Sequence, residues 1–348
     1  MQEINICKIL KRWWFENLQL LILFFLRQHC KRHTIMTRTI LIFAIFTALF
    51  SCSEEKTIDI YAEKMQEFVI DISNYARIYD PDFIIIPQNG IDLAFNNINP
   101  NDGLHSLYLN AINGFGVEEL FYNGIYALDG ERLSMLQHLK HSKKIMVSEF
   151  VSDNNFISDA FSKNYNEGFI AFVRNSSNYH YKQIPDTIPY ENTNDISNLA
   201  LAQNYLYLIS TEKFSSKQEM IYAISATNFD LIIIDLFFNG EEFSPTEINQ
   251  LKTKANGGKR LVISYINIGA AEKFRYYWKP NWKLGNPKWI RKKYKGYDDE
   301  FWIEFWNKEW QDIIYGNDNS YMKKIINAGF DGAYLDNVEA YYFLYHND

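Results

Sequence analysis

Residues that would place this chain in a special structural class are scarce. Its 348 residues include 3 Cys, 8 Pro and 16 Gly, which excludes a disulfide-stapled, collagen-like or proline-rich protein. Neither charge is in large excess, because 35 basic against 42 acidic residues leave a net charge of −7, and this disfavours a nucleic-acid partner. Hydrophobic residues make up 47% of the chain, enough to bury the core of one large domain or two small ones.

Motifs for metal and cofactor chemistry are also missing. The 7 His residues are scattered without ligand spacing, and no glycine-rich phosphate loop or Gly-x-Ser-x-Gly elbow occurs. We therefore expect no metal and no cofactor. Aromatic residues, by contrast, reach 17% of the chain, which indicates either surfaces on which sugars or bases stack or a compositional bias toward Ile, Asn, Lys, Phe and Tyr.

Residues 36–51 have the layout of a bacterial export signal. Arg38 is a short basic region, residues 40–50 are an apolar core, and Leu49-Phe50-Ser51-Cys52 resembles a lipoprotein cleavage box. Cys52 is therefore predicted to carry lipid, since several acyl chains hold a folded domain firmly on a membrane. The alternative is an ordinary secretory signal with an incidental Cys.

The export signal sets the domain organisation. Residues 1–35 are interpreted as an upstream extension from a misplaced start, residues 52–60 as an acidic tether, and residues 61–348 as a single domain. Because Cys7, Cys30 and Cys52 all lie at or before the cleavage point, the mature domain would contain no disulfide. We expect a protein of the bacterial cell envelope, lipid-anchored to the outer membrane on its periplasmic or surface side.

Eight short apolar runs alternate with helical patterns between residues 62 and 335. Continuously apolar runs are typical of strands buried on both faces of a parallel sheet, and their alternation with helices predicts an α/β fold of the (β/α)8 TIM barrel type. The predicted strands are Phe83 to Ile86, Val117 to Tyr122, Ile145 to Phe150, Phe169 to Val173, Tyr205 to Ile209, Leu231 to Phe237, Leu261 to Ile266 and Gly332 to Leu335. The predicted helices are Ala62 to Ala76, Gly130 to Ser142, Ile157 to Tyr165, Ser216 to Ser225, Pro245 to Ala255 and Ser320 to Ala328.

Polar residues gather at the carboxyl ends of these strands, where TIM barrels place their active sites. Each could instead cap a helix or turn, but buried carboxylates carry a desolvation cost that an idle core would avoid. The strand-end candidates are Gln88, Asn89, Glu118, Glu119, Glu149, Asp235, Asn267, Glu272, Asp336, Asn337 and Glu339.

Four segments together resemble glycoside hydrolase family 114, the family of endo-alpha-1,4-polygalactosaminidases and related extracellular glycosidases. The segments are Phe229 to Asp235, Tyr265 to Glu272, Arg275 to Trp278 and Gly329 to Tyr341, with its Leu-Asp-Asn-Val motif. The resemblance covers nearly all of residues 61–348 and implies a barrel that hydrolyses an amino-sugar-containing polysaccharide without a cofactor. Ala270 departs from the family pattern, where an acidic residue is expected.

The resemblance also implies a changed chain order. Residues 61–175 resemble the family's second half and residues 200–348 its first half, so the chain resembles a circular permutant in which family strands five to eight precede strands one to four. Residues 176–199, polar and without an apolar period, would be the joining loop. The new ends, near Tyr61 and His346, should then be neighbours. Half-barrels exchanged in a dimer or an error in gene assembly are the alternatives; we expect a monomer.

The resemblance places the catalytic carboxylates on Asp336 and Glu118. The hypothesis is that Asp336 is the nucleophile and Glu118 the acid/base of a retaining mechanism, which requires carboxyl groups about 5–5.5 Å apart. Adjacent Glu119 is the alternative, because consecutive strand residues face opposite ways.

Other groups are expected to bind the sugar. Carboxylates would attract a cationic hexosamine, and eight Tyr and Trp residues concentrate in the insertion at residues 273–319. These rings could stack on sugars or on bases; an exported protein favours sugars, and about half of the rings are expected to be packing. Predicted substrate-binding residues are Asp235, Tyr265, Asn267, Glu272, Arg275, Tyr276, Trp278, Tyr334, Asn337, Glu339, Gln88, Asn89 and Glu149. The alternative function is a non-catalytic glycan-binding lipoprotein on the same scaffold.

Overall fold

The structure is a computed structural model that describes residues 60–176 and 181–345. The predicted export signal and Cys52 lie outside the described residues. The described residues form one compact unit. Among the described helices, none has the length and apolar character needed to cross a membrane.

The larger sheet has five parallel strands in the order β1-β13-β9-β6-β5. The predicted runs form these strands because their side chains are buried on both faces. The strands are β1 (Ile84–Pro87), β13 (Gly332–Asp336), β9 (Leu261–Asn267), β6 (Leu231–Asp235) and β5 (Tyr205–Tyr207).

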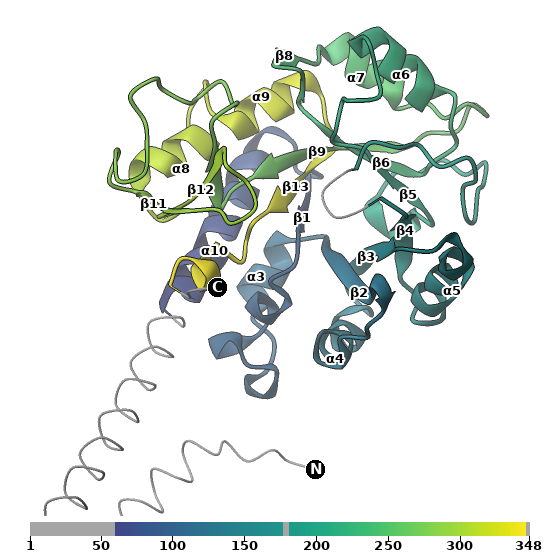
Figure 1. Cartoon of the computed structure of the whole chain (residues 1–348), viewed down its shortest axis with the longest axis horizontal. Helices are drawn as coiled ribbons and strands as arrows, with labels where there is room; N and C mark the ends of the chain where they lie inside the picture. The colour runs from purple at the N-terminus through teal and green to yellow at the C-terminus, as the bar shows by residue number, and fades with distance from the viewer. Residues whose placement is uncertain (1–59, 177–180, 346–348) are drawn as a thin grey trace, which may run out of the picture. The chain divides into compact units, whose positions relative to one another are not determined.

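Three further parallel strands form a second sheet, which continues the first beyond β1. They are β2 (Gly114–Tyr126), β3 (Lys144–Val151) and β4 (Ile170–Arg174), in the order β2-β3-β4. A parallel bridge between Gln88 and Gly116 connects β1 to β2, and β4 lies beside β5 without a ladder joining them in the described part of the chain. All eight predicted strands are confirmed, and the arrangement around a common centre is consistent with a TIM barrel (Figure 1).

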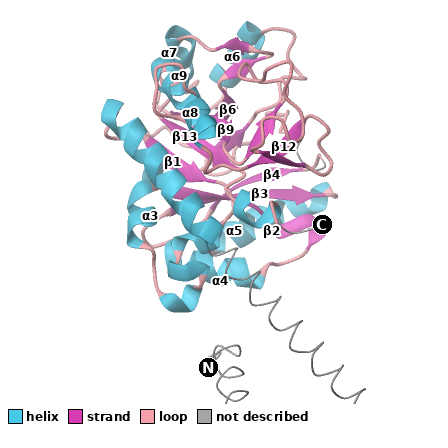
Figure 2. Cartoon of the chain, turned by 90° about the vertical axis from the view of Figure 1, so that its left-hand side faces the viewer, coloured by secondary structure: helices cyan, strands magenta, loops and turns pink. Residues whose placement is uncertain are grey.

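Helices surround the strands, as Figures 1 and 2 show. The predicted helices are confirmed with shifted ends, and three short ones at residues 106–111, 308–314 and 340–343 were not predicted. In chain order the helices are residues 60–79, α3 (Ser106–Ala111), α4 (Gly130–Leu139), α5 (Ile157–Asn166), α6 (Lys217–Ser225), α7 (Pro245–Leu251), α8 (Lys308–Ile314), α9 (Tyr321–Ala328) and α10 (Ala340–Phe343). Short 3-10 turns lie at Ile91–Ala94, Asn96–Ile98, Pro100–Asp102, Asn154–Phe156 and Leu199–Leu201.

Side chains alternate between the inside and the outside of the strands. Tyr334 points inward on β13, where a Cβ at Gly116 would lie 1.9 Å from its hydroxyl oxygen. Glycine at position 116 is therefore required by this close approach. Asp336 and Glu118 each lie two residues further along the same faces, which places both in one layer above the Tyr334 ring.

The insertion at residues 273–319, between β9 and β13, is part of a small folded layer. It contains an antiparallel sheet of β10 (Ala270–Glu272), β12 (Glu300–Ile303) and β11 (Ile290–Lys293), followed by α8. Trp289, Trp302 and Trp310 are at most 3% exposed. Most aromatic rings of this segment therefore pack its own core.

The segment predicted to join the two halves is held against the sheet through a buried ion pair. The Lys254 Nζ lies 2.6 Å from the Asp230 carboxylate, and both side chains are fully buried. Lys254 also donates to the carbonyl of Asn194, and Asn192 donates to Asp230. Because a buried charge without its partner costs about 3–5 kcal/mol, these contacts hold residues 192–194 in place.

The two ends of the domain meet in an aromatic stack. The Tyr61 ring lies 4.4 Å from the Tyr345 ring and 4.5 Å from the Trp306 ring, measured between centroids. The Lys64 ammonium lies over both Tyr61 and Trp306. The prediction that the ends of the domain are neighbours is confirmed.

Candidate active site

A cavity of about 360 Å³ opens at the carboxyl ends of the strands. It brings together both predicted catalytic residues and most of the predicted binding residues. The predicted residues that line it are Gln88, Asn89, Glu118, Asp235, Tyr265, Glu272, Arg275, Asp336, Asn337 and Glu339. Strands β2, β6, β9 and β13 and the turns after β1 and β13 supply most of these side chains, and Glu272 and Arg275 follow β9. TIM barrels place their active sites at the same ends of their strands.

Asp336 is the last residue of β13, and hydrogen bonds fix both of its oxygens. The Tyr265 hydroxyl donates to Oδ2 at 2.5 Å, and the Asn337 amide donates to Oδ1 at 2.7 Å. Asn337 has a φ of 61°, and a Cβ at Gly269 would lie 1.9 Å from its carbonyl oxygen. The turn after β13 therefore depends on a glycine in the neighbouring turn.

Glu118 lies on β2, two strands from Asp336 with β1 between them. The Asn89 side chain accepts from the Glu118 amide at 3.0 Å, and Arg132 donates to the Glu118 carbonyl at 2.8 Å. The Tyr181 hydroxyl donates to Glu118 Oε1 at 2.5 Å. Neighbouring strands lie about 4.8 Å apart, so inward-pointing side chains on β2 and β13 converge over β1.

Glu119 does not line the cavity. It has a φ of 56° where the β2 ladder shifts register, and its carboxylate pairs with Arg174 at 2.8 Å. The bulge turns the two consecutive glutamates to different partners, and Glu118 is the one that faces Asp336.

One cation, Arg275, compensates two buried carboxylates of the cavity. Its guanidinium lies 2.7 Å from Glu272 and 2.7 Å from Asp235, and each of the three residues is at most 9% exposed. Burial raises the pKa of Glu272, and the charge of Arg275 opposes that rise. Arg275 thus connects the insertion to the end of β6 through charge.

Among the described residues, no cation forms an ion pair with Asp336, Glu339 or Glu300, and the pKa values of these three groups are high. Burial raises the pKa of Asp336 to about 7, with the Tyr265 hydrogen bond opposing the rise and the charge of Glu118 adding to it. Burial also raises the pKa of Glu339 to about 7, and burial together with the charges of Glu272 and Asp336 raises that of Glu300 to about 8. Asp336, Glu339 and Glu300 are therefore partly protonated near neutral pH.

Five predicted binding residues lie outside this cavity. Asn267 accepts from the Ala270 amide within the turn after β9, and Tyr334 is buried beneath the cavity. Glu149 is fully buried on the outer side of β3, where it accepts from the Phe121 and Tyr122 amides and from Asn164 of α5. Burial raises the pKa of Glu149, and these hydrogen bonds oppose the rise.

The other two belong to the insertion. Tyr276 lines a neighbouring cavity instead. Trp278 stacks on Phe301 at 5.5 Å and contacts Trp282, so the expectation that it lies in the cleft is corrected. Its ring is held by the aromatic core of the insertion, which sequence spacing does not reveal.

Several residues of the cavity were not predicted. Tyr181 comes from the joining segment, where its ring stacks on Tyr207 at 3.8 Å and lies under the Arg174 guanidinium. Glu300 lies opposite Glu272 in the β10–β12 pairing. The others are Tyr207, Ile209, Ser210, Phe274, Tyr294, Tyr297 and Phe343. Tyr207 lies within the predicted strand Tyr205 to Ile209, and Ile209 ends it, so both could have been found; Tyr181 and Glu300 carry no signal in the sequence.

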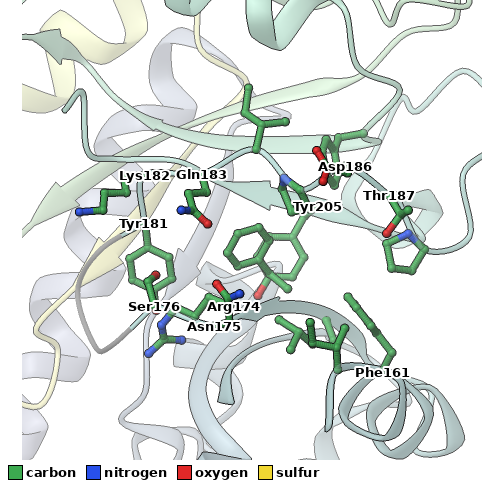
Figure 3. A pocket seen from close by; sticks show the side chains of 18 of the residues that line it. Phe161, Arg174, Asn175, Ser176, Tyr181, Lys182, Gln183, Asp186, Thr187 and Tyr205 are labelled. Carbon is green, nitrogen blue, oxygen red and sulfur yellow. The ribbon is translucent and has the colours of Figure 1, made fainter. Parts of the chain in front are cut away.

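A larger cavity of about 720 Å³ lies between α5 and the joining segment (Figure 3). Tyr181 lines both cavities. The described lining of the larger cavity contains one acidic residue, Asp186, and three basic residues, Arg174, Lys182 and Lys213. The larger cavity therefore lacks the pair of carboxyl groups that acid–base chemistry on a sugar needs. Within residues 60–176 and 181–345, no group of three or more His, Cys, Asp or Glu side chains could hold a metal ion.

We expect Tyr265→Phe to raise the pKa of Asp336 above about 7, because the lost hydroxyl donates to the ionised carboxylate. A ¹³C NMR titration of the aspartate carboxyl groups measures it. Tyr207→Phe is the matched control, since that hydroxyl donates to the neutral Gln88 side chain. An unchanged or lower pKa in Tyr265→Phe would contradict the assignment.

Comparison with known proteins finds a family model that matches part of the chain. Residues 201–348 match the model of glycoside-hydrolase family GH114. An uncharacterized protein of Methanocaldococcus jannaschii is 34% identical over 153 residues, covering 43% of this chain and 41% of that protein. Uncharacterized proteins of Thermotoga maritima and Deinococcus radiodurans are 30% and 31% identical over 118 and 124 residues, covering 34% and 36% of this chain and 35% and 38% of those proteins.

The chain thus spans less than half the length of these relatives. The family match covers all of strands β5, β6, β9 and β13. It includes Asp235, Tyr265, Arg275, Asp336 and Glu339. Glu118 lies outside the matched residues. Over residues 201–348, less than half of its length, this chain is similar to glycoside-hydrolase family GH114.

Proposed function

We propose that the protein is a glycoside hydrolase that cleaves an amino-sugar-containing polysaccharide. The observation that carries this is the meeting of Asp336, within the family match, and Glu118 in one cavity at the strand ends. Glycoside hydrolysis needs two carboxyl groups that flank the scissile bond. Because the two carboxyl groups line one cavity, the charge of Glu118 contributes to the raised pKa of Asp336.

The hydrogen bonds favour different roles for the two groups. Asp336 accepts a hydrogen bond on each oxygen, which orients it as the nucleophile that attacks the anomeric carbon. Glu118 accepts on Oε1 from Tyr181, leaving Oε2 to protonate the leaving oxygen and then to take a proton from water. Asp336 acts ionised and its pKa is about 7, so kcat/KM should increase as the pH rises through about 7.

The carboxyl groups also favour a cationic sugar. Arg275 compensates Asp235 and Glu272, while Asp336, Glu300 and Glu339 hold protons near neutral pH because burial raises their pKa values. An ammonium group on the substrate would lower their pKa values and be attracted by the ionised forms. A deacetylated hexosamine polymer, of the polygalactosaminidase type, is the proposed substrate class.

Asp336→Asn and Glu118→Gln should each lower kcat on a galactosamine-containing polymer by about 10²- to 10⁴-fold, because each removes a reacting carboxyl group. The release of reducing ends measures the rate. Glu119→Gln is the matched control and should retain most activity, since Glu119 points away from the cavity.

The configuration of the first product, followed by ¹H NMR, tests the roles of the two groups. A retained anomer agrees with Asp336 as nucleophile, and an inverted anomer contradicts it. A wild-type protein that binds the polymer but releases no reducing ends would be a glycan-binding protein, against the proposal.

We infer further that the eight strands form a closed barrel in circularly permuted order. Three observations support it: the family match begins at residue 201, the five-stranded sheet continues through the Gln88–Gly116 bridge into β2, and the Tyr61 and Tyr345 rings stack at the ends of the domain. A closed barrel places its first and last strands side by side, so its chain can be reopened at a loop.

Restoring the proposed parental order should give a folded monomer. The variant joins Tyr345 to Tyr61 through a short Gly/Ser linker and opens between Asp186 and Thr187, which are exposed, so that Tyr181 and Asn192 keep their contacts. Near-UV circular dichroism and sedimentation measure the outcome. A chain opened inside β9, between Ile263 and Ser264, is the control that should not fold. A variant that unfolds like this control, or a native chain that sediments as an exchanged dimer, would contradict the proposal.

We also propose that Cys52 carries lipid and anchors the protein in the bacterial cell envelope. The wild-type chain, expressed in a bacterium, should partition into the detergent phase of a Triton X-114 extract, and Cys52→Ala should move to the aqueous phase, because the acyl chains supply the apolar surface. Cys30→Ala is the matched control and should stay with the detergent. A Cys52→Ala protein that also stays there would contradict lipidation at this residue.

A further inference from the structure

A second cavity of about 440 Å³ adjoins the catalytic cavity. The two share five wall residues, namely Ile209, Ser210, Asp235, Phe274 and Arg275. The Asp235–Arg275 ion pair is therefore a common wall, with Asp336 and Glu118 on one side of it. Cavities of roughly 300–1,000 Å³ are typical of small-molecule sites, so the second cavity has the size of a separate binding site.

The second cavity is built on rigid elements. Its floor is the hairpin of β7 (Phe237–Phe238) and β8 (Glu241–Glu242), joined at Asn239 and Gly240. Both turn residues have positive φ, 49° and 87°, as a tight two-residue turn requires. The Thr211 hydroxyl donates to the Asn239 side chain at 2.6 Å, so a strand-end loop and the hairpin are held together.

The chemistry of this cavity differs from that of the catalytic one. Its single carboxylate, Asp235, is compensated by Arg275 and accepts from the Phe237 amide. What remains is hydroxyl and amide groups, from Ser210, Thr211 and Asn239, beside aromatic rings.

Phe274 supplies the most accessible of these rings. It is 63% exposed, and the Arg275 guanidinium lies 5.0 Å from its centroid. The exposed side of the ring offers a flat apolar surface next to the polar groups. Aromatic faces combined with a few convergent polar groups suit a ligand that has apolar faces and a rim of hydroxyl groups.

We propose that the second cavity is a subsite for an uncharged pyranose unit, adjoining the unit that is cleaved at Asp336 and Glu118. This inference rests on the proposed function and deepens it. The polysaccharide crosses the Asp235–Arg275 pair, so the site binds a cationic unit among unpaired carboxyl groups and a neighbouring neutral unit among amide and hydroxyl groups.

Asn239→Gly tests the subsite with little disturbance of the fold, because glycine keeps the positive φ and removes only the side-chain amide. Its kcat/KM should fall on the order of tenfold more for an octasaccharide than for a disaccharide of a partly N-acetylated amino-sugar polymer, whose acetylated units are uncharged. Thr211→Val should act in the same direction. Asn97→Gly, at an exposed asparagine with a φ of 53° that lines neither cavity, should leave both rates unchanged.

Equal losses for short and long chains, or no loss, would overturn the subsite. The gain in affinity from the disaccharide to the octasaccharide should also persist at high salt, since contacts with an uncharged unit are not screened; a gain that salt removes would overturn the uncharged assignment. If the wild type hydrolyses none of these sugars, the proposed function fails, and calorimetric binding of the same oligosaccharides to wild type and Asn239→Gly decides the subsite separately.

Discussion

The cavity at the strand ends depends on one buried cation. Burying a carboxylate without a partner costs several kcal/mol, and this cavity brings Asp235 and Glu272 within 2.7 Å of Arg275. The guanidinium is the right group for that position because its planar fork donates to two carboxylates at once, which a lysine ammonium does not do in fixed geometry. Arg275 also comes from the insertion, while Asp235 ends a barrel strand. The same contact therefore compensates charge, docks the insertion on the barrel and divides the cavity from its neighbour.

Arg275 is already paired with Asp235 and Glu272. Three other carboxyl groups of the cavity are partly protonated near neutral pH. Asp336 and Glu339 have pKa values of about 7, and Glu300 of about 8. Glu118 is held differently, by the Tyr181 hydroxyl, which reaches it from the joining segment. A segment that appears in sequence to be a mere connection thus supplies a wall of the candidate active site, and the Lys254–Asp230 pair keeps that segment on the barrel.

The strands could be predicted because a strand that is buried on both faces is a continuous run of apolar residues, which is visible over a few positions of the sequence. Each of the eight apolar runs is a strand. The catalytic cavity was predictable to the same extent, since Asp235, Glu118 and Asp336 lie at strand ends and parallel strands end at one edge. What failed depends on contacts between distant segments. The antiparallel sheet of residues 270–303 has no apolar alternation strong enough to separate it from a loop, and Trp278 differs from a cleft residue only through its stacking on Phe301. Tyr181 and Glu300 enter the cavity through tertiary packing alone. Glu149 follows the strand-end rule in sequence, yet the pleat directs it outward to Asn164.

A change in chain order is compatible with this site because its parts are neighbours in space and not in sequence. Glu118 and Asp336 lie near opposite ends of the domain, yet β1 alone separates their strands. The entropy of closing a loop grows only with the logarithm of its length, at about 0.6 kcal/mol for each doubling, so moving the break from one loop to another changes the free energy of unfolding little. In the permuted order that we propose, the cost falls instead on the segments at the old and the new break. At one of them Tyr61 stacks on Tyr345 and Trp306, and at the other Asn192 and Asn194 bind the buried Lys254–Asp230 pair. Each break is therefore secured by its own local interactions, which leaves the strand ends between them free to keep the geometry of the site.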